Sequence, residues 1–202
     1  VASYLLDIKA IKLEPTHPFT WASGWKSPIY CDNRKTLSYP EVRTYIRDQF
    51  VNLIKTKYPQ VELIAGVATG AIAQGALVAQ ELGLPFVYVR SAAKNHGLEN
   101  LIEGEYKEGQ KVVVVEDLIS TGGSSLQAGE ALRNAGCDVL GMVAIFTYGF
   151  QKAIDNFTNA HCVLDTLSDY NAMIDLAQKT GYVQESDVAK LKEWRLSPES
   201  YK

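Results

Sequence analysis

The sequence predicts an α/β domain built on a doubly wound, mainly parallel sheet that is flanked by helices. Short apolar runs alternate with amphipathic stretches along most of the chain, which is the pattern of strands joined by right-handed helical crossovers. Residues 112–115 are four consecutive valines, and such an unbroken apolar run is typical of a parallel strand that is covered on both faces. With 202 residues, of which 47% are hydrophobic and 21% charged, we expect one globular domain over 1–202, without dominant disorder, collagen helix or coiled coil.

The elements of this domain can be placed from their flanking residues. Ser38 and Pro40 provide an N-cap and an early proline for a helix that runs to about Tyr58. Gly83 ends an alanine-rich helix over 69–82, which lies between short apolar strands at 62–66 and 85–90. The remaining pattern predicts a strand over 111–115, a helix over 122–136, a strand over 139–148 and two closing helices over 168–179 and 185–194.

Two segments fall outside this alternation. Residues 13–37 are rich in proline, glycine, serine and aromatic residues, and we expect them to form a small N-terminal hood over one edge of the sheet. Residues 91–110 hold three glycines and join two predicted strands. Because loops of this length in compact domains are usually functional or disordered, we expect a mobile functional loop there.

The charge and cysteine patterns exclude several classes of protein. The chain has 23 acidic and 20 basic residues and a formal net charge of −3, so it lacks the basic excess of a general nucleic-acid binder. Cys31, Cys137 and Cys162 are widely spaced without a CxxC pair, which indicates neither a disulfide framework nor a zinc site. No apolar run approaches the roughly 20 residues that cross a bilayer, and the first residues lack an export signal. We therefore expect a cytoplasmic protein without a nucleic-acid or membrane partner.

The strongest chemical pattern is VVVVEDLISTGGSS, residues 112–125. The predicted strand ends in Glu116 and Asp117, at the carboxyl edge where open α/β sheets bind ligands. Gly122 and Gly123 allow backbone amides to approach an anion, and the helix N-terminus adds free N–H groups with partial positive charge. Further donors are the hydroxyl groups of Ser120, Thr121, Ser124 and Ser125. This chemistry predicts a site for a phosphate monoester.

The two acids need a different partner, because carboxylates beside a phosphate are unfavourable unless they meet hydroxyl groups or a cation. The two hydroxyls of a ribose can each donate to a carboxylate, so the acids and the phosphate loop together predict a site for ribose 5-phosphate. Other phosphate motifs fit badly. No lysine follows the glycines as in a Walker A loop, and Gly66, Gly70 and Gly75 lack GxGxxG spacing.

The segment VVVVEDLISTGGSS is similar to the phosphoribosyl-diphosphate signature of the type I phosphoribosyltransferase family. FTWASGWKSPIYCDNR at 19–34 and RSAAKNHGLENLIEG at 90–104 resemble the substrate hood and mobile catalytic loop of the orotate-specific branch. The resemblance covers nearly the whole chain. It implies transfer of ribose 5-phosphate from 5-phosphoribosyl 1-diphosphate to orotate, giving orotidine 5′-monophosphate and diphosphate in pyrimidine (UMP) biosynthesis. It also implies Mg²⁺ as cofactor and a homodimer with shared active sites.

The resemblance further assigns roles by position. Glu116 and Asp117 would hold the ribose hydroxyls, the backbone of Leu118 and Ile119 would continue the wall, and Ser120 would contact orotate. The 5′-phosphate would be wrapped by Thr121, Gly122, Gly123 and Ser124. The aromatic ring of Tyr30 and the cation of Lys26 are further candidates for the orotate pocket.

The loop would supply the cations that grip the diphosphate of the neighbouring subunit: Arg90, Lys94 and His96. Lys94 is the first catalytic candidate because it is a flexible point charge, and His96 could donate a proton or a hydrogen bond. Mg²⁺ would be held by donor oxygens and waters, with no direct protein ligand.

Four positions depart from the family pattern. Ala22 and Ser91 stand where lysines are usual, Asn95 stands where an aspartate is usual, and Tyr148 stands where some members have an arginine that contacts orotate. These differences bear on how orotate is held more than on the donor site.

Two alternatives remain open. A purine-type phosphoribosyltransferase would share the donor loop but would need a different hood, and KSPIYCDNR at 26–34 disfavours it. A non-catalytic regulator that senses phosphoribosyl diphosphate would carry an added DNA-binding helix pair or a basic face, or would lack the loop cations. His17 and His161 stand alone in the sequence, and we interpret them as structural.

Overall fold

A six-stranded sheet forms the centre of the computed structural model, which describes residues 1–21, 24–90 and 101–200. The strand order across the sheet is β10 (Leu164–Asp169), β9 (Asp138–Thr147), β8 (Lys111–Ile119), β5 (Leu63–Val67), β6 (Phe86–Val89) and β7 (Ile102–Glu103). All neighbouring strands are parallel except β7, which is antiparallel to β6. The chain runs outward from β5 to β6 and then crosses back to β8 on the other side of β5. This confirms the predicted doubly wound, mainly parallel sheet and puts its topological switch point between β5 and β8.

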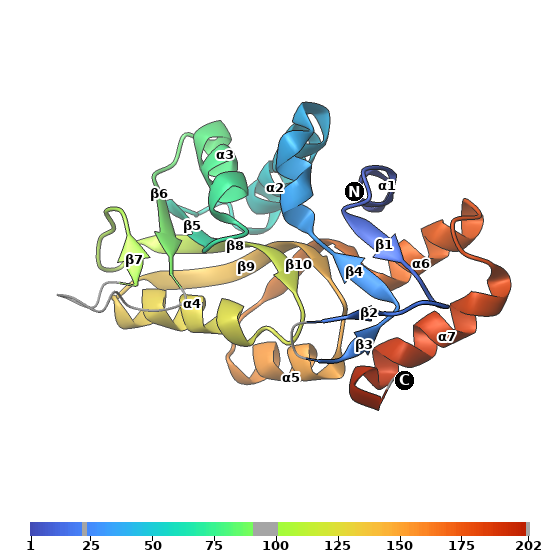
Figure 1. Ribbon diagram of the computed structural model, residues 1–202. Coiled ribbons are helices and arrows are strands. Elements are labelled where there is room, and N and C mark those ends of the chain that lie inside the picture. The colour runs from blue at the N-terminus through green and yellow to red at the C-terminus, as the bar shows by residue number, and fades with distance from the viewer. Residues whose placement is uncertain (22–23, 91–100, 201–202) are drawn as a thin grey trace.

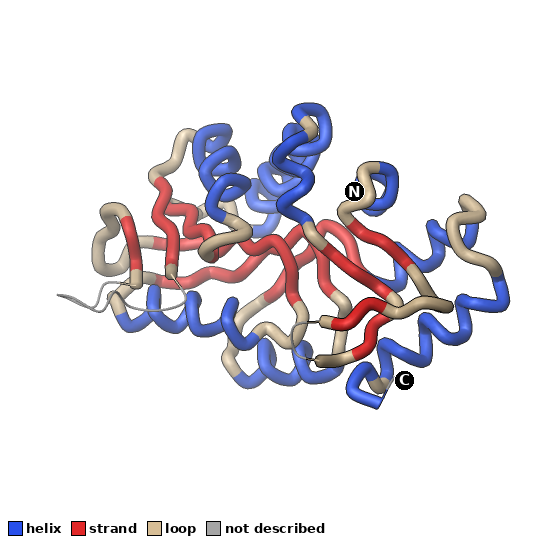
Figure 2. The backbone as a smooth tube through the Cα atoms, in the orientation of Figure 1, coloured by secondary structure: helices blue, strands red, loops and turns tan. Residues whose placement is uncertain are grey.

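Helices cover both faces of this sheet (Figures 1 and 2). Helices α2 (Pro40–Lys57) and α3 (Ile72–Leu82) lie on one face, and α4 (Gly123–Asn134) and α5 (Gln151–Asn159) lie on the other. The valines of β8 alternate between the two hydrophobic clusters that result. Val113 and Val115 belong to the first cluster, and Val112 and Val114 belong to the second. The burial on both faces that the valine run predicts is therefore confirmed.

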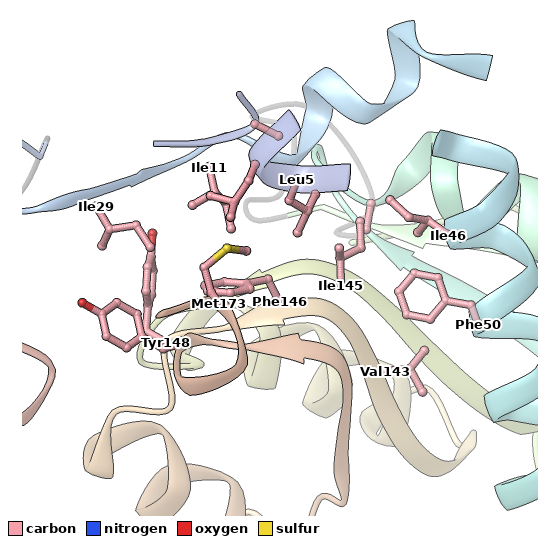
Figure 3. Close-up of a cluster of buried hydrophobic side chains, with 14 of the residues drawn as sticks. Leu5, Ile11, Ile29, Ile46, Phe50, Val143, Ile145, Phe146, Tyr148 and Met173 are labelled. Atoms are coloured by element: carbon pink, nitrogen blue, oxygen red, sulfur yellow. The ribbon is translucent and has the colours of Figure 1, made fainter. Parts of the chain in front are cut away.

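The first cluster extends from the sheet into the N-terminal part of the chain. Figure 3 shows Val143 and Ile145 of β9 together with Phe50 of α2 and with Leu5 of α1 (Ala2–Asp7). All four side chains are at most 5% exposed. The N-terminal helix thus packs into the same core as the sheet. Within the described residues, no helix is both long enough and apolar enough to span a membrane.

The N-terminal strands form two small antiparallel pairs beside the main sheet. One pair is β1 (Ile11–Leu13) with β4 (Ile29–Cys31), and the other is β2 (Phe19–Thr20) with β3 (Lys26–Ser27). The 3₁₀ helix η1 (Asn33–Ser38) follows. These elements correspond to the expected hood over about 13–37, although β1 begins two residues earlier, at Ile11.

The C-terminal helices support this hood. They are α6 (Tyr170–Lys179) and α7 (Glu185–Leu196), and a short 3₁₀ helix η2 (Pro198–Ser200) follows them. Trp194 of α7 is 1% exposed. Its Nε1 donates a hydrogen bond to the carbonyl of Lys26 at 3.3 Å, and its ring lies 5.6 Å from the ring of Trp21 and 5.9 Å from that of Tyr148. The aromatic cluster therefore fixes β3 and the start of the hood to the end of the chain.

Several predicted boundaries differ from the structure. Strand β8 continues through Glu116 and Asp117 to Ile119, because its pairing with β9 continues to the register Ile119 with Thr147. The helix expected from residue 69 begins at Ile72, and the one expected from residue 168 begins at Tyr170, because the two residues before it belong to β10. The sequence reasoning also missed α1, α5, β7 and β10.

Candidate functional site

The switch point between β5 and β8 brings two loops to the same edge of the sheet. Strand β8 carries Glu116 and Asp117 near its carboxyl end, and β5 leads into a turn through Thr69 and Gly70 before α3 begins. The two strands are hydrogen-bonded neighbours, with Gly66 of β5 opposite Val115 of β8. The acids therefore lie beside the β5–α3 turn. Sequence reasoning missed this turn, although an apolar strand that contains Gly66 and is followed by Gly70 is a signal that could have marked it.

Glu116 is the buried member of the acid pair, with 6% exposure. Its Oε1 accepts a hydrogen bond from the backbone N–H of Asp117 at 2.8 Å, and its Oε2 accepts one from the hydroxyl of Ser125 at 2.8 Å. Burial, and then the negative charge of Asp117, raise the pKa of Glu116 to about 8. Because Ser125 is 2% exposed and donates to Glu116, its expected place among the phosphate donors is wrong.

Asp117 is the half-buried member and faces a cavity. A Cβ added to Gly70 would lie 2.6 Å from Cγ of Asp117, so the carboxylate fits only because residue 70 has no side chain. The backbone carbonyl of Asp117 accepts a 2.6 Å hydrogen bond from Nδ2 of Asn33, which is 2% exposed. The Oδ1 atom of Asn33 accepts in turn from the thiol of Cys31 at 3.3 Å. The hood is thereby joined directly to the strand that carries the acids.

The predicted phosphate loop forms the start of α4. Gly122 is the residue before the first turn, with φ of +79°, and no side chain caps the helix and no acid lies in its first turn. The N–H groups at this end are therefore free of side-chain partners within the helix, and they add to the partial positive charge there. Helix α5 supports the loop from behind. Nδ2 of Asn156 donates to the carbonyl of Thr121 at 2.9 Å, and a Cβ on Gly122 would lie 2.5 Å from the ring of Phe157.

A cavity that we call the donor cavity joins these elements. Its lining comes from the hood, from the β5–α3 turn, from β8 and from the start of α4. The residues are Cys31, Asp32, Arg34, Val67, Ala68, Thr69, Gly70, Glu116, Asp117, Leu118 and Ser124. Asp32 and Arg34 were not among the predicted site residues, because nothing in the sequence places the hood next to β8.

A second cavity of about 300 Å³, which we call the base pocket, lies under the hood. It is lined by Thr20, Trp21, Tyr30, Cys31, Leu118, Ser120 and Tyr148. The structure thus brings Ser120 and Tyr30, both predicted near orotate, into one pocket. Lys26 does not line it, but its Nζ donates to Oγ1 of Thr20 at 2.8 Å. Cys31 and Leu118 line both cavities, so the base pocket and the donor cavity are adjacent.

Tyr148 occupies the inner side of the base pocket, with 2% exposure. Burial, and then the nearby Cys31 thiol, raise the pKa of Tyr148 well above its ordinary value. The phenol is therefore neutral at physiological pH and able to donate a hydrogen bond.

The loop residues are only partly within the described part of the chain. Arg90 follows β6, and its backbone N–H donates to the carbonyl of Leu101 at 2.8 Å. Its guanidinium pairs with Glu103 at 3.3 Å, and it lines a further cavity that also includes Ser124. The other predicted loop residues, Lys94 and His96, lie outside the described residues, as do Ala22, Ser91 and Asn95.

His17 and His161 line neither the donor cavity nor the base pocket. No group of three or more His, Cys, Asp or Glu side chains within residues 1–21, 24–90 and 101–200 could hold a metal ion. The carboxylates in the lining of the donor cavity, Asp32, Glu116 and Asp117, are oxygen groups of the kind that Mg²⁺ and its bound waters prefer as partners.

Comparisons with known proteins agree with this geometry. Residues 37–175 match the family model described as the phosphoribosyl transferase domain. The chain is 63% identical over 201 residues to an orotate phosphoribosyltransferase of Porphyromonas gingivalis, covering 100% of this chain and 96% of that one. It is 64% identical over 197 residues to the enzyme of the same name from Bacteroides thetaiotaomicron, covering 98% and 93%. The crystal structure of orotate phosphoribosyltransferase from Aeropyrum pernix is similar with a TM-score of 0.79 and 26% identity, covering 91% of this chain and 99% of that one.

Proposed function

The chain belongs to the orotate phosphoribosyltransferase family, and from this premise we propose how its residues divide the reaction. The reaction transfers ribose 5-phosphate from 5-phosphoribosyl 1-diphosphate to orotate and gives orotidine 5′-monophosphate and diphosphate in pyrimidine biosynthesis. One observation supports the division best: the donor cavity and the base pocket share Cys31 and Leu118. A ribose in the first cavity and a pyrimidine in the second would meet at this boundary, where the new carbon–nitrogen bond forms.

The donor binds by its 5′-phosphate at the N-terminus of α4, on the backbone N–H groups and hydroxyls of Thr121–Ser124. Its ribose hydroxyls donate to the acid pair of β8. Both acids line the cavity, and Asp117 is the first acceptor because it is the more exposed of the two, whereas Glu116 is 6% exposed. Burial, and then the charge of Asp117, raise the pKa of Glu116 to about 8, which favours the protonated carboxyl. Its capacity to accept from the second hydroxyl therefore increases as the pH rises toward 8.

The base binds in the base pocket between the ring of Tyr30 and the wall formed by Leu118 and Ser120. Trp21 and Tyr148 close the apolar inner side of this pocket. The hydroxyl of Ser120 and the neutral phenol of Tyr148 are the hydrogen-bond donors that we assign to orotate. Lys26 acts indirectly, because its Nζ donates a hydrogen bond to the hydroxyl of Thr20, and Thr20 lines the pocket.

The bond between the anomeric carbon and the diphosphate breaks with its electron pair remaining on the diphosphate. Negative charge grows on the diphosphate in the transition state. Groups that bind this charge more tightly in the transition state than in the ground state accelerate the step. We assign this role to the cations Arg90, Lys94 and His96. Mg²⁺, when bound to the donor oxygens, would neutralise part of the same charge, and the carboxylates of Asp32 and Asp117 line the same cavity.

We further propose a homodimer in which 90–104 of one subunit completes the site of the other. This proposal rests on the resemblance of 90–104 to the family's shared loop.

The three cysteines of the chain are free thiols, which is compatible with a protein that functions in the reducing cytoplasm.

A base-panel assay tests the function. Purified protein is incubated with 5-phosphoribosyl 1-diphosphate and Mg²⁺ and with one of four bases, namely orotate, uracil, hypoxanthine or adenine. We expect nucleotide and diphosphate to form with orotate alone. Consumption of a purine instead would refute the assignment and support the purine-type alternative, and no consumption with donor bound would support the regulator.

Substitutions of lysines test the loop. Lys94→Ala should lower kcat by orders of magnitude with donor affinity mostly kept, whereas Lys107→Ala, at an exposed lysine between β7 and β8, should be neutral. A near-normal rate for Lys94→Ala would remove this residue from the mechanism.

If the sites are shared, mixing Lys94→Ala with Asp117→Asn subunits should restore part of the activity. The absence of restoration in mixed dimers would mean that each subunit works alone.

A further inference from the structure

Arg34 is a cation of the donor cavity that neither the sequence pattern nor the proposed division of roles uses. It follows β4 on the hood, and its side chain is 63% exposed. Among the described residues that line the donor cavity it is the sole lysine or arginine, and three acidic residues share the lining with it: Asp32, Glu116 and Asp117. The cavity therefore has one fixed positive charge in its described lining, and Arg34 carries it.

The guanidinium of Arg34 is oriented by only one of its nitrogens. Its Nε donates to Oδ1 of Asp32 at 2.8 Å. Within the described part of the chain its two terminal nitrogens make no hydrogen bond. The Asp32 hydrogen bond and the nearby charges of Asp32 and Asp117 raise the pKa of Arg34, so the group stays charged. A guanidinium held at Nε presents its two terminal N–H groups as a fork, which is the geometry that binds phosphate oxygens in pairs.

A purely structural role explains this arrangement poorly. Asp32 and Arg34 are two residues apart, with side chains that are 22% and 63% exposed, and a local ion pair whose arginine is exposed contributes little to stability. The bond that fixes this segment to the sheet is instead the one from Asn33 to the carbonyl of Asp117. Arg34 is thus not required to hold the hood in place.

The position of Arg34 identifies the group that it would bind. The helix α4 N-terminus suits the 5′-phosphate, and the acids of β8 suit the ribose. The part of the cavity that remains is lined by Arg34, Asp32 and the β5–α3 turn. We propose that Arg34 binds the 1-diphosphate of the donor, with Asp32 as the residue that positions it. This inference rests on the proposed function, because it takes phosphoribosyl diphosphate to be the donor.

Binding measurements with three ligands test the inference. Inorganic diphosphate with Mg²⁺, the intact donor and ribose 5-phosphate are titrated calorimetrically into wild type, Arg34→Gln, Arg34→Lys, Asp32→Asn and the control Arg47→Gln. Arg47 is a matched control, since its Nε also donates to a neighbouring aspartate, Asp48, at 2.9 Å, but on α2 outside the site. Circular dichroism and a melting curve establish that each variant is folded.

We expect Arg34→Gln to weaken diphosphate and donor binding by roughly 10- to 100-fold, the loss of a charge-assisted hydrogen-bond pair, and to leave ribose 5-phosphate binding unchanged. Arg34→Lys should keep part of the affinity, Asp32→Asn should show a smaller loss, and Arg47→Gln should show none. Unchanged diphosphate affinity in Arg34→Gln would overturn the inference. An equal loss for ribose 5-phosphate would do the same, because it would mean a general disturbance of the cavity.

The failure of the proposed function would look different. Wild type would then consume no orotate in the base panel, whatever the ligand affinities of Arg34→Gln. A functional enzyme whose diphosphate affinity is insensitive to Arg34 would refute only the role of this residue.

Discussion

Glu116 allows a quantitative test of the acid pair, because its protonation links the stability of the fold to pH. Its carboxyl is buried next to Asp117, and burial is the first cause of its raised pKa. Glu116→Gln removes the titration but keeps a carbonyl that can accept from the N–H of Asp117, as Oε1 of Glu116 does. The amide nitrogen can donate to Ser125. Comparison of the variant with wild type therefore measures the effect of the Glu116 proton while the packing of the side chain is kept.

The size of the effect follows from the two pKa values. The pKa rises from an ordinary 4.5 to about 8 in the folded protein. Between these two pH values the unfolded chain loses a proton that the folded chain keeps, so the free energy of unfolding falls with rising pH, by about 1.4 kcal/mol per pH unit. Below this window both states are protonated, and above it neither is. Across this window the loss amounts to several kcal/mol.

Urea denaturation of wild type and Glu116→Gln at half-unit steps from pH 4.5 to 8.5 measures this loss. The free energy of unfolding of Glu116→Gln should increase relative to that of wild type across the window. The difference between the two proteins should then stay constant above about pH 8. Glu41→Gln, at an exposed carboxyl in the first turn of α2, serves as the control and should parallel wild type. A difference between Glu116→Gln and wild type that is the same at every pH would refute the assignment of the proton to Glu116.

Three further substitutions test contacts around the site. Asn33→Ala removes the hydrogen bond to the carbonyl of Asp117 and should lower the free energy of unfolding by about 1–3 kcal/mol; an unchanged urea midpoint would contradict this. Gly122→Ala forces a side chain onto a residue with φ of +79° and brings its Cβ to 2.5 Å from Phe157. It should lower the free energy of unfolding by about 1–3 kcal/mol and weaken the binding of ribose 5-phosphate. Full affinity for ribose 5-phosphate in calorimetry would argue against phosphate binding by this loop. Trp194→Ala should cost about 3–5 kcal/mol in thermal denaturation, and a loss below 1 kcal/mol would mean that α7 does not support the hood.

The interior of the sheet could be predicted because its strands are covered on both faces. The valines of β8 and the apolar residues of β5 and β9 have no polar alternation, so they indicate buried strands by themselves. Strand β10 is different. It lies at the edge of the sheet, and its sequence, LDTLSD, mixes two leucines with polar residues. Such a half-buried strand has no pattern that separates it from a loop, and the helix after it was therefore expected to start too early.

The site shows the same division between local and distant signals. The residues from Glu116 to Ser124 could be proposed together as a site because one strand–loop–helix unit carries them all. Asp32, Arg34 and Gly70 come from other parts of the chain, and they reach the acids only through the pairing of β5 with β8 and the Asn33 hydrogen bond. Neither contact leaves a periodic trace in the sequence.

The alternating valines of β8 have a consequence for how the protein opens. Consecutive side chains of this strand are buried in different cores, so β8 cannot leave one core without leaving the other. The two faces of the sheet should therefore unfold in one cooperative step, and the amides of β8 should exchange with solvent only when the whole domain unfolds. Glu116 and Asp117 are carried by this strand, so local opening of the hood or of the edge strands leaves the acids in place.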